Sequence, residues 1–275
     1  MFLLLIILII LYISFILNKK NKIPNIIHFI FGLKPQNEEF LFIYYLSILS
    51  SYIVNNPSKI YFYYHYEPYG MWWDRLKEKI PIITFEKVEL PTHIGNKELK
   101  HFAHKADWIR MNKLYERGGI YMDIDTISVK PYKELLKYNT VLGYEIQRDN
   151  LICNAIMLTS QKSPFFKLWL HNYEKEFNPD GWGEASIHLP GKINKEYPNL
   201  ALVLPEKAFF RPYATEGKDI FEKNININEE LITLHLWESF TINYMKEIKN
   251  FEWIKKNKDT LYSKIVFANI KESDI

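Results

Sequence analysis

A predicted helix, a Gly-Gly break, a short apolar strand and two aspartates follow one another in residues 105–131, KADWIRMNKLYERGGIYMDIDTISVKP. This segment constrains the fold more than any other part of the chain. Asp123 and Asp125 form the only Asp-x-Asp in the sequence. In an extended segment, side chains at positions i and i+2 point to the same face, so both carboxylates can address one hard cation or one polyphosphate.

Short apolar runs alternate with longer amphipathic segments along the rest of the chain, which predicts an α/β sheet domain. Glycine tolerates the left-handed conformation that ends a helix, so Gly118-Gly119 marks the end of the helix before the aspartates. We expect strands at 25–31, 59–64, 82–88, 120–122, 140–145, 152–158, 200–204 and 231–236, helices at 38–54, 69–79, 97–117, 164–177 and near 184–195, and a helical cover over the sheet from residue 239 onward.

The first residues predict a membrane anchor. Residues 2–17, FLLLIILIILYISFIL, carry no charge and reach roughly 24 Å as a helix, just under the thickness of a bilayer core. No small-x-small cleavage site follows, so we expect an uncleaved anchor at 1–18 and a basic stem at 19–24 rather than a signal peptide. This predicts a single-pass protein of the secretory pathway (Golgi or ER) or another host membrane. Its sidedness stays open, because the basic residues follow the apolar run.

Composition excludes several classes of protein. The formal net charge of +3 is too small and too dispersed for a nucleic-acid groove, so no nucleic-acid partner is expected. Cys153 is the single cysteine, which rules out an internal disulfide and a cysteine-built zinc site. Its apolar neighbours favour a buried thiol.

Two further polar residues lie on the helix that leads to the aspartates. Asp107 and Arg110 are three positions apart, so they share one helix face. The four groups should converge near the carboxyl end of a strand, where open α/β sheets bind nucleotides. The alternatives are a strand-end turn capped by aspartate and an ordinary surface ion pair. His28, on an apolar strand, is expected to be a core histidine rather than a ligand.

These segments resemble glycosyltransferase family 32, which includes yeast Golgi mannosyltransferases and capsular polysaccharide enzymes and is similar to the clostridial glucosylating toxins. The resemblance implies a GT-A-like single α/β domain at 25–275, with a mixed, mainly parallel nucleotide-binding sheet. It also implies retaining transfer of a hexose from a UDP- or GDP-linked nucleotide-sugar to a glycan, glycolipid or protein acceptor. The matching segments are IPNIIHFIFG (23–32), HKADWIRMNKLYERGGIYMDIDTISVKP (104–131), NAIMLTSQKSPF (154–165) and LHLWESF (234–240).

The resemblance also implies roles for individual residues in donor binding. Phe31 stands where the family carries an aromatic residue, usually Trp, near the nucleotide base. Asp107 and Arg110 match a D-x-x-R whose side chains hold the donor's ribose and sugar. Asp123 and Asp125 match the DXD, in which Asp125 is expected to ligate the divalent ion directly and Asp123 to act through ribose or water.

A C-terminal element is implied to close over the diphosphate. His235 is expected to complete the metal shell, with Glu238 and Ser239 as alternatives, and Trp237 to cover the phosphates. From the sequence alone, His235 is equally consistent with packing and with metal binding.

The chemistry of the reaction supports the same set of residues. A divalent cation held by carboxylates stabilises a departing diphosphate, and oxygen ligands suit Mn²⁺ or Mg²⁺. Arg110 supplies a planar donor that keeps its proton. Retention of the anomeric configuration can arise in two ways. Either a carboxylate or amide group lies beneath the anomeric carbon, or the acceptor attacks from the same face from which the leaving group departs. Asn154 and Glu145 are candidates for the group beneath the anomeric carbon.

Two other functions compete with the transferase. The run IYMDIDT resembles the D-x-D-x-T motif of haloacid-dehalogenase-like phosphatases, but the fit fails by one residue, because Ile127 occupies the place of the required threonine. A membrane-anchored carbohydrate-binding protein without catalysis is the third reading. The intact set of Asp107, Arg110, Asp123 and Asp125 argues against it.

Overall fold

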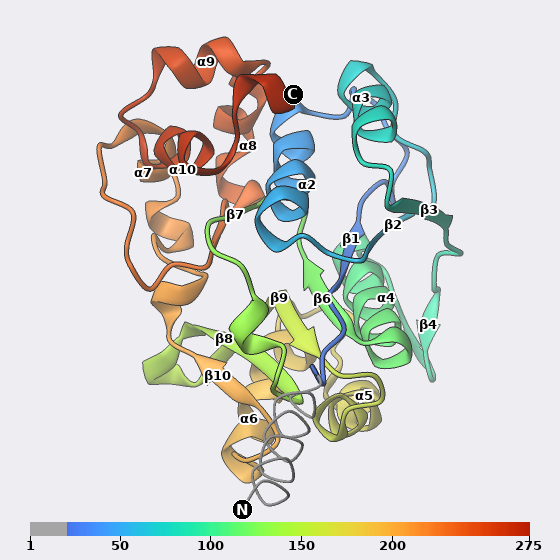
Figure 1. The fold of residues 1–275 in the computed structure, drawn as a ribbon. Coiled ribbons are helices and arrows are strands. Elements are labelled where there is room, and N and C mark those ends of the chain that lie inside the picture. Colours follow the sequence, from blue (N-terminus) through green and yellow to red (C-terminus); the bar gives the residue numbers. More distant parts are fainter. Residues whose placement is uncertain (1–20) are drawn as a thin grey trace, which may run out of the picture.

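A seven-stranded sheet forms the centre of the computed structural model, which describes residues 21–275 (Figure 1). Its strand order is β10-β8-β9-β6-β1-β2-β3. Only β9 is antiparallel to its neighbours, β6 and β8, so the sheet is mixed and mainly parallel, as predicted. The strands are β1 (Ile26–Ile30), β2 (Lys59–Tyr64), β3 (Ile83–Lys87), β6 (Gly119–Met122), β8 (Thr140–Ile146), β9 (Leu151–Thr159) and β10 (Leu202–Leu204).

Helices cover both faces of this sheet, because its central strands are apolar on both sides. Successive side chains of a strand point to opposite faces. Ile120 and Met122 of β6 therefore join one hydrophobic core, and Tyr121 between them joins the other. The first core includes residues of α2 (Phe42–Asn55) and α3 (Met71–Lys79), and the second includes residues of α4 (Phe102–Arg117), α5 (Pro164–Glu176) and α6 (Leu189–Glu196).

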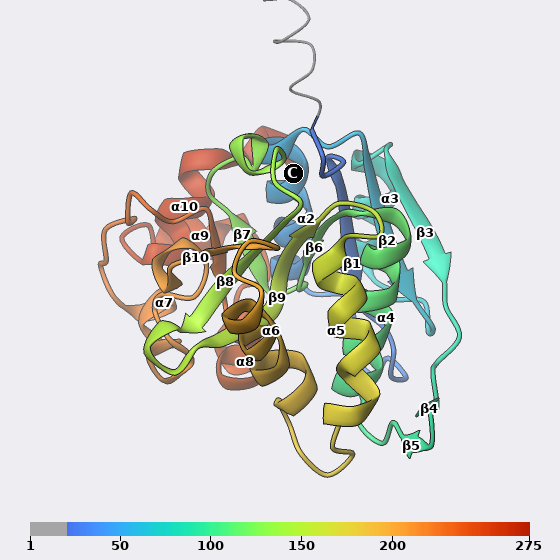
Figure 2. The same ribbon diagram turned by 90° about the horizontal axis from the view of Figure 1, so that it is seen from below.

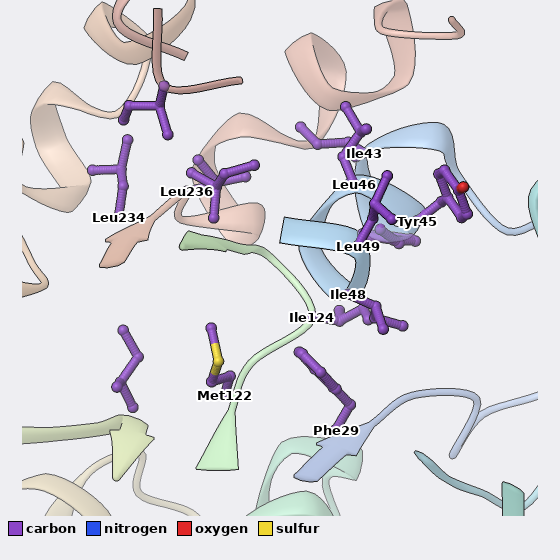
Figure 3. Packing of buried hydrophobic residues seen from close by; sticks show 14 of the residues in the cluster. Phe29, Ile43, Tyr45, Leu46, Ile48, Leu49, Met122, Ile124, Leu234 and Leu236 are labelled. Atoms are coloured by element: carbon purple, nitrogen blue, oxygen red, sulfur yellow. The ribbon is translucent and has the colours of Figure 1, made fainter. Parts of the chain in front are cut away.

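A second, two-stranded sheet lies beside the carboxyl end of β6. It pairs β7 (Thr126–Ser128) with β11 (Thr233–His235) in antiparallel register. Figure 3 shows Ile124, between β6 and β7, directed towards the side chains of α2, with Leu234 and Leu236 in the same core. This small sheet joins the DXD segment to a part of the chain more than 100 residues later.

The remaining elements lie around this framework. The last helices were predicted as a cover over the sheet, but α10 packs mainly on α7 and α2. These elements are β4 (His93–Ile94), β5 (Lys97–Glu98), α7 (Asp219–Glu222), α8 (Glu238–Glu247), α9 (Phe251–Lys256), α10 (Leu261–Asn269), and single helical turns at Lys133–Leu135, Gln147–Asp149, Glu184–His188, Glu206–Ala208, Ala214–Glu216 and Glu272–Asp274.

The helix predicted at 97–117 begins later than expected. Residues His93–Ile94 and Lys97–Glu98 pair as a small hairpin, so α4 starts at Phe102. Gly95 provides the left-handed residue of the turn, with a φ of 55°. The predicted helix therefore began five residues too early, in a segment that instead pairs as a strand and leads into α4.

The predicted single-pass membrane localisation is contradicted. Over residues 21–275, no helix is both long and apolar enough to cross a bilayer. The longest of these helices, α4, has 16 residues, including several charged ones, whereas a membrane span needs about 20 apolar residues. The predicted anchor at 2–17 lies outside the described residues.

Candidate active site

A cavity of about 640 Å³ opens at the carboxyl edge of the large sheet. It is lined by residues that follow β1 and β6, by the first turns of α4, by β8 and β9, and by the β11–α8 connection. Figure 2 shows this edge towards the bottom of the view, because the arrow of β3 points that way and the start of α4 lies there. Every predicted site residue lines this cavity: Phe31, Asp107, Arg110, Asp123, Asp125, Glu145, Asn154, His235, Trp237, Glu238 and Ser239.

The two aspartates lie in a tight turn rather than in the extended segment that we predicted. The Asp123 amide donates to the Ala155 carbonyl (2.8 Å), and the Thr126 hydroxyl donates to the Asp123 carbonyl (2.8 Å). Ile124 between the aspartates is 5% exposed and packs in the core against α2 (Figure 3). The turn buries the apolar residue and leaves both carboxylates on the cavity.

Arg110 holds Asp123 in place. Its Nη1 lies 3.1 Å from Asp123 Oδ1, and its guanidinium lies 4.5 Å from the centre of the Tyr121 ring. The Tyr121 hydroxyl donates to the same carboxylate at 2.6 Å. Burial raises the pKa of Asp123 above its usual value, although Arg110 opposes this shift.

Asn154 connects Arg110 to Asp107. The Asn154 Nδ2 donates to Asp107 Oδ1 at 2.8 Å, and Asn154 Oδ1 accepts from Arg110 Nη1 at 3.3 Å. Both ends of the amide are therefore engaged. Arg110 Nε lies 3.6 Å from Asp107 and has no hydrogen-bond partner within residues 21–275.

The small β7–β11 sheet brings His235 and Glu238 to Asp125. His235 lies opposite Thr126 in the strand register, and its Nε2 is 3.4 Å from Asp125 Oδ2. The Glu238 amide donates to the same oxygen at 2.7 Å. Trp237 adopts a left-handed φ of 61°, and its ring centre lies 4.3 Å from that of His235. This backbone conformation is uncommon for a bulky residue, and such strain concentrates at functional sites.

The surplus of carboxylates shifts the pKa of the neighbouring groups. Burial alone would lower the pKa of His235, but the adjacent Asp125 carboxylate has the opposite effect, and the pKa is raised overall. Burial and then the Asp125 charge raise the pKa of Glu238 to about 7. The Tyr44 hydroxyl donates to Glu238 Oε1 at 2.8 Å. Several acids thus compete for little positive charge, an arrangement typical of a cation site.

Asp123, Asp125 and His235 could hold a metal ion, because one ligand atom from each lies within 4.8 Å of the others. Nδ1 of His235 is buried without a hydrogen-bond partner among residues 21–275. Buried polar atoms are normally paired, so this nitrogen fits a group that binds a ligand. Two carboxylates and an imidazole suit a divalent ion such as Mn²⁺.

Two other predictions, for His28 and Cys153, are settled by the structure, whereas the role predicted for Phe31 stays a prediction. His28 is a core histidine, because its ring nitrogens lie 2.9 Å from the Tyr63 hydroxyl and 2.9 Å from the Gly118 carbonyl. Cys153 is buried, as expected. Phe31 lines the cavity mouth and packs on Tyr44, with ring centres 5.0 Å apart.

Tyr44 and Tyr121 support the site but were not predicted from the sequence. Tyr121 lies two positions before Asp123, so strand alternation could have placed its side chain on the same face. For Tyr44, the sequence carries no local signal, because its partner Glu238 is 194 positions away.

Comparison with known proteins identifies the family. Residues 48–142 match the family model described as the glycosyltransferase sugar-binding region containing the DXD motif. The chain is 34% identical to glucan organizing enzyme 1 of Cryptococcus neoformans, over 96% of this chain and 76% of that protein. It is 26% identical to lactosylceramide 4-alpha-galactosyltransferase of Mus musculus, over 56% of this chain and 42% of that protein.

Among solved structures, the chain is weakly similar to the apo form of the glycosyltransferase GlyE of Streptococcus pneumoniae. The TM-score is 0.48, the sequence identity is 13%, and the match covers 85% of this chain and 64% of that chain. The mixed, mainly parallel sheet is the one expected for a GT-A-like α/β fold. The chain therefore belongs to the DXD-containing glycosyltransferases of the family 32 type.

Proposed function

We propose that this protein transfers a hexose from a UDP- or GDP-linked nucleotide-sugar to a glycan, glycolipid or protein acceptor, with retention of the anomeric configuration. The observation that carries the proposal is the convergence of Asp123, Asp125 and His235 in one cavity, with ligand atoms within 4.8 Å of one another. A bound Mn²⁺ or Mg²⁺ would neutralise charge on the departing diphosphate. The imidazole favours Mn²⁺, because Mg²⁺ prefers oxygen ligands.

The residues around this cluster orient the donor. Arg110 is fixed by Asp123, Asn154 and the Tyr121 ring, so its charge stays in one place as the leaving group departs. Asp107 is held by Asn154, which supports a role in binding donor hydroxyl groups. Trp237 and Phe31 supply apolar surface at the cavity wall for the donor.

Glu145, rather than Asn154, is our proposal for the group that faces the anomeric carbon. Asn154 uses both ends of its amide on Asp107 and Arg110, so we assign it a positioning role. Glu145 lines the cavity at an irregular register between Tyr144 and Ile146 of β8, and such bulges re-aim side chains near active sites. It forms no ion pair within residues 21–275, and burial raises its pKa. A carboxylate there would stabilise the positive anomeric carbon.

The names of the relatives support a saccharide-bearing acceptor. The mouse relative is named for lactosylceramide, a glycolipid, and the fungal relative for glucan, a polysaccharide. We extend this to a glycan or glycolipid acceptor for the present chain.

A panel of radiolabelled nucleotide-sugars tests the proposed function. The full chain, stripped with EDTA, is incubated with UDP-glucose, UDP-galactose, UDP-N-acetylglucosamine or GDP-mannose, with Mn²⁺, Mg²⁺ or no metal. We expect at least one donor to release its sugar only when the metal is present. Proton NMR of the transfer product should show the same anomeric configuration as the donor.

Two outcomes would overturn the proposal. Hydrolysis of a generic phosphate ester without release of sugar from any donor would favour a phosphatase. Sugar binding without donor turnover under every metal condition would favour a non-catalytic carbohydrate-binding protein.

A further inference from the structure

Three large aromatic side chains are exposed at the mouth of the cavity. Phe102, Trp182 and Phe240 are 42%, 64% and 66% exposed, and all three line the cavity. Single exposed hydrophobic residues are ordinary on protein surfaces, whereas a group of them on the wall of one cavity marks a binding surface. The proposed donor chemistry uses none of these three residues.

Trp182 forms an exposed aromatic platform that packs on two histidine rings. Its ring centre lies 5.9 Å from that of His104 and 6.4 Å from that of His101. His104 is itself buried against Phe177, with ring centres 5.0 Å apart. The histidines support part of the indole ring while most of its surface remains exposed to solvent. A tryptophan face can bind a flat apolar surface at low entropic cost, because the side chain has only two rotatable bonds.

Two of the three exposed aromatics, Phe102 and Phe240, belong to helices that also carry residues of the proposed donor site. Phe102 begins α4, the helix of Asp107 and Arg110. Phe240 lies in α8, two residues after Glu238, whose amide is bonded to Asp125. A molecule held by these aromatics would therefore be placed relative to the proposed reacting centre.

Polar side chains line the same cavity as the three aromatics. They include Lys34, Gln36, Ser186 and Ser239. A pyranose ring has an apolar C–H face for stacking and hydroxyl groups at its edge for hydrogen bonds. An acyl chain would leave these polar groups without partners, so the composition of the mouth favours sugar over lipid.

We propose that Trp182, together with Phe102 and Phe240, stacks on a sugar ring of a glycan acceptor at the cavity mouth. The proposal rests on the proposed transferase function and names the part of the acceptor that the enzyme recognises. It assigns Trp182 to acceptor recognition, and it makes the sugar, rather than any lipid attached to it, the recognised group.

Transfer to defined acceptors tests this platform. Once a donor is identified by its metal-dependent hydrolysis, methyl and octyl glycosides of glucose, galactose, mannose and lactose serve as acceptors for wild type, Trp182→Ala, Trp182→Phe and Phe240→Ala. Phe267→Ala is the matched control, because Phe267 is 45% exposed on α10 and does not line the cavity.

We expect Trp182→Ala to raise the acceptor KM about tenfold for methyl and octyl glycosides alike, from the loss of about one stacking contact. The ratio of transfer to donor hydrolysis should fall in parallel, Trp182→Phe should recover part of it, and Phe267→Ala should match wild type. A Trp182→Ala effect confined to octyl glycosides would assign the platform to lipid and overturn the proposal. An unchanged transfer-to-hydrolysis ratio would overturn it as well, whereas absence of donor hydrolysis in wild type would instead refute the proposed function.

Discussion

Two clusters of charged and polar side chains in this protein are built from the same residue types, but only one of them lies on the cavity. The acid cluster at the cavity contains Asp107, Arg110, Asp123, Asp125 and His235. The Glu86 cluster, between β2, β3 and α4, contains His28, Tyr63, Glu86, Lys113 and Arg117. Each has a cation over a tyrosine ring, a buried histidine and a carboxylate.

In the Glu86 cluster two cations share one carboxylate, and each polar group has a partner. Lys113 and Arg117 lie 2.6 and 2.7 Å from the two oxygens of Glu86. His28 uses both ring nitrogens, and burial lowers its pKa to about 4. This cluster is complete without a ligand, which is the state expected of a structural network.

In the acid cluster, carboxylates exceed cations and two buried nitrogens have no partner. Within residues 21–275, neither His235 Nδ1 nor Arg110 Nε is hydrogen-bonded. The pKa of His235 is raised by its acidic neighbours against burial, unlike that of His28. Burial of charge alone therefore does not identify a functional site. An excess of carboxylates with unpaired buried atoms on a cavity does.

The largest expected effect separates the two clusters by activity. Asp125→Asn should lower kcat/KM by roughly 10³-fold, because the proposed metal site loses a charged ligand. The folded state should remain intact, since asparagine can still accept from the Glu238 amide. Steady-state transfer and electron paramagnetic resonance of added Mn²⁺ measure the two consequences. Near-normal turnover, or unchanged Mn²⁺ affinity, would remove the metal role.

Arg110→Lys should lower kcat/KM by roughly 10²-fold, because an ammonium group cannot reproduce a planar fork that contacts both Asp123 and Asn154. Lys113→Arg in the Glu86 cluster is the matched control and should keep wild-type kinetics. The measurement is steady-state transfer at saturating metal. Wild-type kinetics for Arg110→Lys would show that Arg110 acts only as a point charge.

Acid should destabilise the protein through His28. Its pKa is lowered from 6.5 to about 4 by burial, so the unfolded chain binds a proton between these values and the folded chain does not. The His28 contribution is fully present above pH 6.5 and is lost as the pH falls towards 4. Between pH 7 and pH 5 the free energy of unfolding should fall by about 2 kcal/mol from this group. Urea unfolding of wild type and His28→Gln at both pH values measures it, and an equal pH dependence in the two proteins would contradict the assignment.

The smallest effect is a stability change without an activity change. Glu86→Gln should lower the free energy of unfolding by about 1 kcal/mol, because two charge-assisted contacts at a partly exposed site are weakened. Its kcat/KM should stay within about twofold of wild type, since Glu86 does not line the cavity. Urea unfolding and steady-state transfer test both parts. A large loss of turnover with normal stability would show that the Glu86 cluster serves the reaction.

The sequence predicted most of the fold through local periodicity. Strand β2 was predicted with the observed bounds, and the strands and helices around the DXD segment were found within a few residues. The error at 97–101 arose because a two-residue pairing leaves no periodic signal. Strand β7 was missed for the same reason, since Thr126–Ser128 is only three residues long.

Asp107, Arg110, Asp123 and Asp125 could be grouped from the sequence, because the first two share a helix face and the last two directly follow the strand after that helix. What only the tertiary structure decided is the partnership with Asn154, His235, Glu238 and Tyr44. The Glu238 amide and Asp125 are 113 positions apart, and the Tyr44 hydroxyl and Glu238 are 194 apart. Such contacts depend on how β7 pairs with β11 and how α2 packs beside them. Periodicity reports which face of an element is apolar, but not which distant element covers it.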